Sequence, residues 1–145
     1  MDDRDLDQLR RAIALAAQAR TAGDPPFGST IIDATGTVLA EDRNTTASDD
    51  DITAHPELKL ARWAARHLTP AAARTVTMYT SCRPCPMCAN AIARASIGRV
   101  VYALDTHQLD DLKPAGFVNP GASEPVYDGP ALLDEARQPL AGFYH

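Results

Sequence analysis

The chain has 145 residues, of which 45% are hydrophobic, 23% charged and 6% aromatic, and this composition is typical of one globular domain with a substantial core. Lysine and arginine number 14 against 19 acidic residues, so the net charge of −5 argues against a nucleic-acid groove as the main surface. All three cysteines lie within residues 82–88, and this odd, clustered set argues against a scattered disulfide framework and favours metal or redox chemistry.

The N-terminal end does not resemble a targeting segment. Residues 1–5 include three aspartates, and no apolar signal-peptide region follows them. The longest purely apolar run nearby covers residues 12–17, far short of the ~20 residues that a membrane span needs. Together with the clustered thiols, this predicts a reduced, cytoplasmic location.

Four features are expected in the first third of the chain. Apolar residues recur at helical spacing over residues 5–22, and Gly23 ends this helix. Two strands follow at 28–32 and 37–42, joined by a turn of hairpin length. The polar, Asp-rich stretch 43–53 is expected to be a loop. The apolar stripe of the helix consists of Leu6, Leu9, Ile13 and Ala16 or Ala17.

The middle of the chain alternates helices with strands. A second helix is expected to begin near His55-Pro56, because proline suits the first helical turn, and to end before Pro70. A strand over 75–80, a helix over Met87–Ala95 and a strand over 99–103 follow. The apolar stripe of the second helix consists of Leu58, Ala61, Ala65 and Leu68.

An apolar run such as 99–103 is typical of a strand buried on both faces of a parallel sheet. The order of helix, hairpin, and then helices alternating with strands predicts an α/β fold, a three-layer α/β/α sandwich around a mixed five-stranded sheet. Between 105 and 129, repeated Pro and Gly predict a long loop with one short strand at Val126-Tyr127, before a helix over 130–137. We expect residues 1–145 to form a single domain.

Three soft metal ligands fall at two predicted helix starts. His55 stands at one, and Cys85 and Cys88 stand at the other, where their spacing turns both sulfurs toward one ion. The partial positive charge of a helix N-terminus favours the thiolate form of these cysteines. One imidazole and two thiolates leave a fourth tetrahedral position open, which is typical of a catalytic zinc rather than a structural one.

Such a zinc ion needs a base beside it. Two thiolates cancel the charge of Zn²⁺, so a bound water is acidified less than it is by three neutral histidines. Glu57, two residues after His55, is the candidate for that catalytic base.

The segments His55-Pro56-Glu57 and Pro84-Cys85-Pro86-Met87-Cys88 form the pattern His-x-Glu followed by Pro-Cys-x-x-Cys, a signature of zinc-dependent base deaminases. The chain resembles the cytidine deaminase superfamily, within it the branch of guanine deaminases, fungal-type cytosine deaminases and tRNA adenosine deaminases. The resemblance extends from Pro26 to Val100 and thins beyond Asp105. It implies a cytidine deaminase-like fold, zinc as the cofactor and a homodimer.

The resemblance also implies a reaction, the hydrolytic deamination of a small free nucleobase or nucleoside. Glu57 would deprotonate water at the zinc ion, and the amidine carbon that bears the exocyclic amine would be attacked. Glu57 would then return the proton to a ring nitrogen and to the leaving amine, releasing ammonia. The expected partner is therefore a small molecule rather than a nucleic acid or a membrane.

Four residues are expected to contact the substrate. The resemblance implies that Asn44 hydrogen-bonds the substrate base, and Ala54 directly precedes the histidine ligand. Phe27 either stacks on the base or packs under the sheet, with packing favoured. Tyr144, in the C-terminal tail 143–145, is either part of a lid over the zinc, as in some relatives, or part of an aromatic anchor against the same or a partner subunit.

Residues 80–88 and 48–55 look most like the guanine deaminase branch, so a guanine-like purine is the leading substrate. That branch carries Gly-Phe-Asp-Asp, with Asp used in proton transfer, where this chain reads Gly116-Phe117-Val118-Asn119; Asp110 or Asp111 is the candidate replacement. Cytosine, a nucleoside or an aminotriazine-type heterocycle remains open. The net charge and the missing basic C-terminal stretch disfavour a tRNA adenosine deaminase.

Two alternatives outside deamination also remain open. With Cys82 as a fourth ligand, the same residues would form a closed Cys3His structural zinc site in a non-catalytic module. The other alternative is a Cys-x-x-Cys redox pair, although such a pair needs no His-x-Glu partner. We expect Cys82 to be a bystander, and we note that Arg83 stands where relatives usually carry Glu.

Overall fold

The computed structural model describes residues 1–119 and 122–144, so residues 120–121 and 145 of the predicted loop and tail lie outside the described part. The chain falls into two compact units, Met1–Lys113 and Pro114–His145. The prediction that the whole chain forms one domain stays a prediction. Within the described residues, no helix is both long and apolar enough to cross a membrane.

The first unit is built on a mixed sheet with the strand order β2-β1-β3-β4. Its strands are β1 (Gly28–Ile32), β2 (Val38–Arg43), β3 (Thr77–Cys82) and β4 (Arg99–Leu104). β1 pairs antiparallel with β2 and with β3, whereas β3 pairs parallel with β4. Because parallel neighbours need a crossover connection, the chain passes through a helix between β3 and β4.

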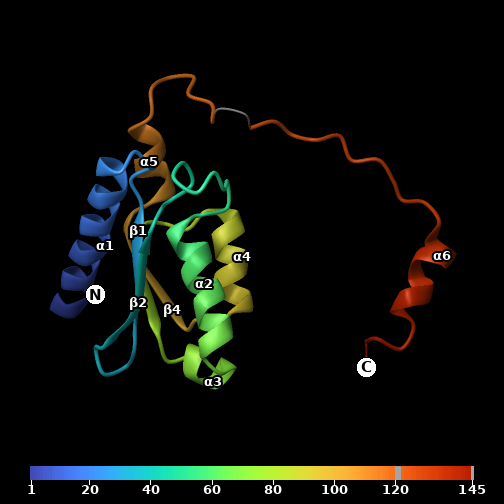
Figure 1. The fold of residues 1–145 in the computed structure, drawn as a ribbon, viewed down its shortest axis with the longest axis horizontal. Helices are drawn as coiled ribbons and strands as arrows, with labels where there is room; N and C mark the ends of the chain where they lie inside the picture. The colour runs from blue at the N-terminus through green and yellow to red at the C-terminus, as the bar shows by residue number, and fades with distance from the viewer. Residues whose placement is uncertain (120–121, 145) are drawn as a thin grey trace. The chain divides into compact units, whose positions relative to one another are not determined.

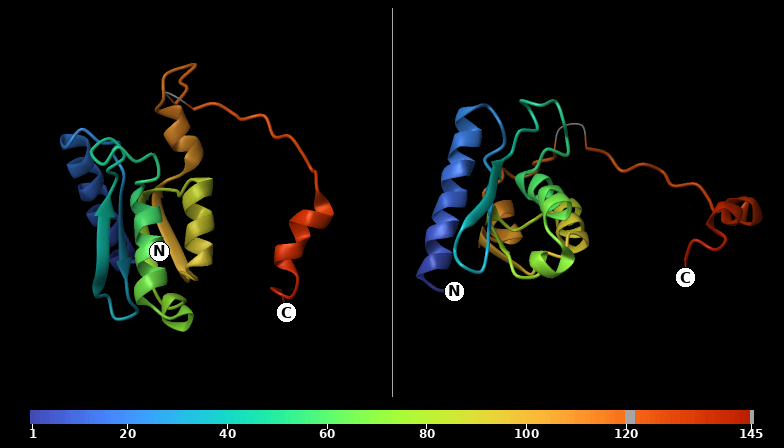
Figure 2. Two further views of the ribbon diagram at one scale, coloured as in Figure 1. Left: turned by 45° about the vertical axis from the view of Figure 1, so that its right-hand side comes forward. Right: turned by 60° about the horizontal axis from the view of Figure 1, so that its bottom comes forward.

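Helices cover both faces of this sheet (Figure 1). α1 (Asp3–Thr21) lies on one face, while α2 (Pro56–His67) and α4 (Pro86–Arg94) pack side by side on the other (Figure 2). A short helix, α3 (Pro70–Ala73), connects α2 to β3, and α5 (Thr106–Asp111) follows β4. The predicted three-layer α/β/α arrangement is therefore confirmed for the first unit.

The two faces of the sheet form separate cores, because side chains alternate along each strand. Ile31 and Met78 stand opposite each other on β1 and β3 and belong to the core beneath α2 and α4. Ile32 and Tyr79 point the other way and form a smaller core with Leu9 of α1. This alternation decides which strand residues can face the ligand-bearing helices.

α1 packs very closely on the start of β1. A Cβ atom on Gly28 would lie 2.5 Å from both the Ala12 carbonyl oxygen and the Leu15 Cβ, so a larger residue would push the helix away. The predicted stripe of this helix is wrong in part, because Leu6 and Ile13 are exposed and small residues take the contact instead. The buried face consists of Asp5, Leu9, Ala12, Leu15, Ala16 and Ala19.

The buried face of α2 also differs from the prediction. Ala65 is exposed, whereas Ala64 is buried. The reason is that Glu57 itself belongs to the inward face, which continues at helical spacing through Leu60 and Ala61. The predicted apolar stripe leaves out Glu57, and it is therefore rotated about the helix axis relative to the face of α2 that is buried.

One helix of the first unit was not predicted, and one strand lies further along the chain than expected. α5 lies inside the expected loop, because the Asp105 side chain accepts a hydrogen bond from the Thr106 N–H and the Gln108 side chain accepts one from the Asp105 N–H. β3 begins at Thr77 and ends at Cys82, later than expected, because α3 takes up the chain before it.

The second unit contains α6 (Leu133–Arg137) and a 3-10 turn over Gln138–Leu140. α6 begins later than predicted because Leu132 adopts a left-handed conformation, with a φ of 54°, that no right-handed helix includes. The predicted fifth strand is wrong: Val126 and Tyr127 are 93% and 88% exposed and join no strand. Among the described residues, the sheet has four strands.

An ion pair between a buried aspartate and a half-exposed arginine ties α1 to the sheet. Asp5 is 4% exposed, and its carboxylate accepts hydrogen bonds from two Arg99 nitrogens, at 2.9 and 3.0 Å, and from the Tyr79 hydroxyl at 2.7 Å. The hydrogen bond from Arg99, and after it the one from Tyr79, lowers the pKa of Asp5 well below its usual range. The interaction holds the first turn of α1 against β3 and β4.

Asp5→Asn should lower the free energy of unfolding at neutral pH by about 1–3 kcal/mol, because Arg99 loses its anionic partner. The folded-state pKa of Asp5 is below its unfolded value, so this stabilisation is present above about pH 4 and is lost as the pH falls through the folded pKa. Urea unfolding at pH 7 and at successively lower pH should show the difference from wild type shrinking in acid.

The control for this prediction is Asp7→Asn, which changes an exposed aspartate of α1 that pairs with Arg10 at 2.7 Å. This variant should change the free energy of unfolding by less than about 0.5 kcal/mol. If the Asp5 variant instead remained equally destabilised in acid, its effect would come from packing and not from charge.

Candidate active site

Two helices of the first unit start side by side, and each start carries predicted metal ligands (Figure 1). His55 is the residue before α2 and Cys85 is the residue before α4; both have extended backbone angles, and a proline follows each. Proline favours an extended conformation in the residue before it and is itself suited to the first helical position. The same local rule therefore sets both helix starts, with Cys88 in the first turn of α4.

The three ligand side chains fit a zinc ion. Nδ1 of His55 lies 3.6 Å from Sγ of Cys85 and 3.5 Å from Sγ of Cys88, and the three atoms lie within 4.8 Å of one another. Zn–S bonds of about 2.3 Å and a Zn–N bond of about 2.0 Å at a tetrahedral angle require a nitrogen–sulfur separation of about 3.5 Å. Within residues 1–119 and 122–144, no other three metal-ligating side chains lie this close together.

The pKa values of the two ligand thiols are shifted in opposite directions. The hydrogen bond with Cys88, and after it the one with His55, lowers the pKa of Cys85 to about 4. The hydrogen bond with Cys85, together with burial, raises the pKa of Cys88. The hydrogen bond to Cys85 also raises the pKa of His55. A divalent cation among these atoms takes the place of a thiol proton and makes both sulfurs thiolate ligands.

Glu57 lies on the inward face of α2, two residues after the histidine ligand. It is only 5% exposed. Burial raises the pKa of its carboxyl group, and hydrogen bonds, among them those from Thr80 and Ser29, oppose that rise. A carboxyl group with a raised pKa is suited both to take up a proton and to return it.

Two hydroxyl groups contact a single oxygen of Glu57. Thr80 Oγ1 lies 2.8 Å and Ser29 Oγ lies 3.2 Å from Glu57 Oε1. Sequence reasoning missed both residues, although a signal was present. They occupy inward strand positions next to the apolar pair Ile31 and Met78, where a buried hydroxyl needs a polar partner.

Cys82 stands apart from the ligand set. It ends β3 and is 5% exposed, and its sulfur is not among the atoms that lie within 4.8 Å of one another. Burial raises the pKa of its thiol. This placement disfavours a closed Cys3His site. The next residue, Arg83, turns toward β4, where it pairs with Asp105 at 3.4 Å and lies over the Tyr102 ring.

Backbone hydrogen bonds hold the loop after β2 against the start of α2. The N–H of Asn44 donates to the Phe27 carbonyl at 2.9 Å, and the N–H of Thr45 donates to the Ala54 carbonyl at 3.1 Å. These bonds bring together three of the residues that the sequence singles out for substrate contact. Of the three, Ala54 directly precedes the first zinc ligand, His55, along the chain.

The side chain of Asn44 is buried and oriented. Asn44 is 3% exposed, and its Oδ1 accepts hydrogen bonds of 2.9 Å from both the N–H and the hydroxyl of Thr46. Because Oδ1 faces Thr46, the Nδ2 donor points the other way. Phe27 is half-buried, and the N–H of Ala54 donates to the Asp51 carbonyl at 3.0 Å.

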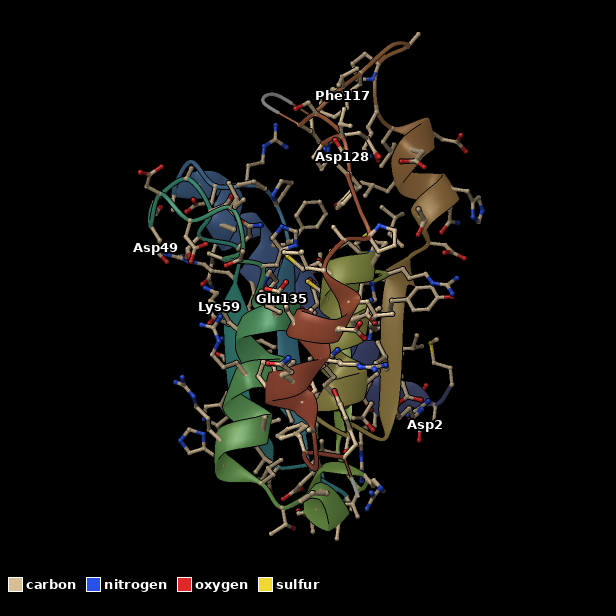
Figure 3. All side chains as sticks on the ribbon, turned by 90° about the vertical axis from the view of Figure 1, so that its right-hand side faces the viewer. Asp2, Asp49, Lys59, Phe117, Asp128 and Glu135 are labelled. Atoms are coloured by element: carbon tan, nitrogen blue, oxygen red, sulfur yellow. The ribbon has the colours of Figure 1, made fainter. Side chains whose placement is uncertain are left out.

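The same loop is anchored on both sides. Asp24, 5% exposed, accepts hydrogen bonds from two loop N–H groups, at 3.0 and 2.8 Å, and from the Ser48 hydroxyl at 2.5 Å. On the other side, the Thr45 hydroxyl donates to Asp49 at 2.6 Å and accepts from Lys59 of α2 at 2.9 Å. Figure 3 shows Asp49 and Lys59 on the same side of the unit. Sequence reasoning missed Asp24, which no pattern singles out.

Tyr144 belongs to the second unit. It is 80% exposed, and its ring meets that of Phe143 edge-on with the ring centroids 5.0 Å apart. The structure therefore brings Asn44, Phe27 and Ala54 together, and it describes Tyr144 only within its own unit. The roles of all four residues as substrate contacts stay predictions.

An α/β/α sandwich that presents one histidine and two cysteines beside a buried carboxylate defines a zinc-dependent hydrolytic enzyme. Residues 2–104 match the family described as the cytidine and deoxycytidylate deaminase zinc-binding region. The chain belongs to this family, and it is a zinc-dependent hydrolytic deaminase.

The chain is similar to several deaminases along most of its length. It is 33% identical over 156 residues to a probable cytosine deaminase of Schizosaccharomyces pombe, covering 99% of this chain and 94% of the relative. It is 38% identical over 110 residues to a guanine deaminase of Bacillus subtilis, covering 75% and 68% of the two chains. The X-ray structure of guanine deaminase from Bacillus subtilis superposes with a TM-score of 0.74 at 29% identity, covering 99% of this chain and 94% of that one.

Replacing either cysteine ligand should remove the metal. Cys85→Ala and Cys88→Ala should each lose most of the zinc, because two protein ligands hold the ion far more weakly than three, whereas Cys82→Ala should keep about one zinc per chain. Metal analysis of protein purified under reducing conditions measures the difference. Loss of zinc from the Cys82 variant, with its fold intact, would instead place Cys82 among the ligands.

Proposed function

We propose that the chain removes the exocyclic amine of a small free nucleobase or nucleoside by hydrolysis and releases ammonia, with a guanine-like purine as the leading substrate. The observation that carries this proposal is the buried Glu57 carboxylate beside the ligand set of His55, Cys85 and Cys88. Burying a carboxylate costs free energy, and a zinc site with a purely structural role has no need for it.

When bound, zinc supplies a Lewis acid that acidifies water and so provides the nucleophile. Glu57 carries two protons in turn. It takes the first from the attacking water and gives it to a ring nitrogen of the base, and it takes the second from the hydroxyl group now bonded to the attacked carbon and gives it to the departing amine, so that ammonia leaves and a carbonyl forms. Asn44 donates a hydrogen bond from Nδ2 to an acceptor on the base, since its Oδ1 is engaged by Thr46. Phe27 and Ala54 form the adjoining wall, and Tyr144 is the proposed contact from the C-terminal tail.

Two similarities support a purine. The 38% identity to a guanine deaminase and the TM-score of 0.74 to a guanine deaminase structure both favour a guanine-like base. Cytosine is the second candidate, because the match to a probable cytosine deaminase covers 99% of this chain. A tRNA-specific adenosine deaminase of Haemophilus influenzae is 30% identical over 104 residues, covering 72% of this chain and 60% of the relative. The net charge of −5 disfavours such a polyanionic substrate here.

A screen of ammonia release from the zinc-loaded protein tests the proposal. Guanine, cytosine, cytidine, adenosine, adenine and aminotriazines are compared, and guanine is expected to give the highest rate. Glu57→Gln is the matched control; it should keep about one zinc per chain but lose turnover by roughly 10²-fold or more, because an amide cannot carry the proton. The proposal fails if no compound releases ammonia while zinc is bound, or if the Glu57 variant retains nearly normal activity.

We also propose that the chain works as a homodimer in the reducing cytoplasm, where its three free cysteines would persist. The candidate contact surface of this dimer is the set of large apolar side chains that the second unit does not bury within itself. They include Val118, Val126, Tyr127, Leu132, Leu133, Phe143 and Tyr144.

Light scattering of the purified protein at micromolar concentration should give twice the 15.5 kDa mass of one chain. Replacing Val126 and Tyr127 with Ser should shift the mass toward that of a monomer, because their apolar surface is the expected contact. A monomeric mass for the unmodified chain would refute the dimer.

A further inference from the structure

Two buried hydroxyl residues form a matched pair on the inner face of the sheet. Ser29 of β1 and Thr80 of β3 stand directly opposite each other, and both are fully buried. The next pair along this face, Ile31 and Met78, is apolar and belongs to the core beneath α2 and α4. A hydroxyl without a hydrogen-bond partner is costly in such a place, so the change from apolar to polar residues needs a reason.

The distances show how the two hydroxyl protons are used. The Thr80 hydroxyl has one proton and two acceptors in reach, Glu57 Oε1 at 2.8 Å and the Gly28 carbonyl at 3.5 Å. The Ser29 hydroxyl lies 2.8 Å from Thr80 Oγ1 and 3.2 Å from Glu57 Oε1. If each proton takes its shorter path, Ser29 donates to Thr80 and Thr80 donates to Glu57. The result is a one-way chain that ends on a carboxylate oxygen, and donation along such a chain strengthens its last bond.

We propose that Ser29 and Thr80 are positioning residues for the reaction, forming a hydroxyl chain that holds Oε1 of Glu57 and thereby presents Oε2 to the reacting groups. The proposal rests on the proposed function for the role of Glu57. Neither hydroxyl contacts Oε2. A carboxylate held at one oxygen keeps a fixed plane, so the other oxygen both takes up the proton and returns it from one position. Holding a reacting group in place in this way is a large part of catalysis.

The decisive variants differ by a single hydroxyl. Thr80→Val keeps the shape of the side chain but removes the donor, whereas Thr80→Ser keeps the donor and removes a methyl group. Thr80→Val should lower kcat by about 10²-fold with little change in KM and with zinc retained, because misplacing a catalytic group is costly in the chemical step. Thr80→Ser should restore most of kcat. Ser29→Ala, which leaves Thr80 in place, should cause a smaller loss.

Thr30 provides the matched control. It belongs to β1, where it stands opposite Tyr79 of β3, and it is as fully buried as Ser29. Its hydroxyl has no partner among the described residues, but it sits on the α1 face of β1. Thr30→Val should therefore leave kcat and zinc content unchanged. Equal loss of activity in the Thr30 and Thr80 variants would overturn the proposal, because the effect would then belong to packing of the sheet.

Crystal structures of the two Thr80 variants supply a measurement that does not depend on turnover. In Thr80→Ser, Glu57 Oε1 should stay within hydrogen-bond distance of the introduced hydroxyl, whereas in Thr80→Val the carboxylate should rotate or adopt more than one conformation. An unmoved carboxylate in Thr80→Val would refute the positioning role even if the wild-type protein deaminates a base. A moved carboxylate in a protein that deaminates nothing would support the positioning and refute the proposed function instead.

Discussion

The arrangement of the first unit around Glu57 follows from the free-energy cost of burying a carboxylate. Glu57 is almost fully buried, and a carboxylate in that position needs hydrogen bonds and positive charge around it. The sheet supplies two hydroxyls, the first turn of α2 supplies the positive end of its dipole, and the ligand set supplies a place for a cation. The rotation of α2 follows from the same requirement, because the face that carries Glu57 must point at β1 and β3.

The parts of the fold that could be predicted are those governed by short-range rules. The two X-Pro helix starts could be read from His55-Pro56 and Cys85-Pro86, because proline constrains its neighbours whatever the surrounding structure. The three candidate zinc ligands could then be recognised, because each lies at one of these two helix starts. The order of helices and strands in the first unit then led to the three-layer arrangement.

The parts that could not be predicted depend on partners far away in the sequence. Nothing local marks Asp5 as a buried residue, because Arg99 lies ninety-four positions further along the chain. The hydroxyl of Thr80 and the carboxylate of Asp24 likewise form their hydrogen bonds with residues that are distant in the sequence. The predicted fifth strand belongs to the same class: Val126 and Tyr127 have side chains that favour strands, but a strand also needs pairing, and within the described residues these two join none.

The close approach of α1 to Gly28 limits the substitutions that α1 and the start of β1 can accept. Even-numbered residues at the start of β1 face α1, while Ser29 between them faces Glu57. A side chain at position 28 would displace either the helix or the strand, and a displaced strand would carry the Ser29 hydroxyl with it. Larger residues on the alanine-rich face of α1 would therefore also affect the position of Ser29. Only the thickness of a single strand separates that face of α1 from the Ser29 hydroxyl beside Glu57.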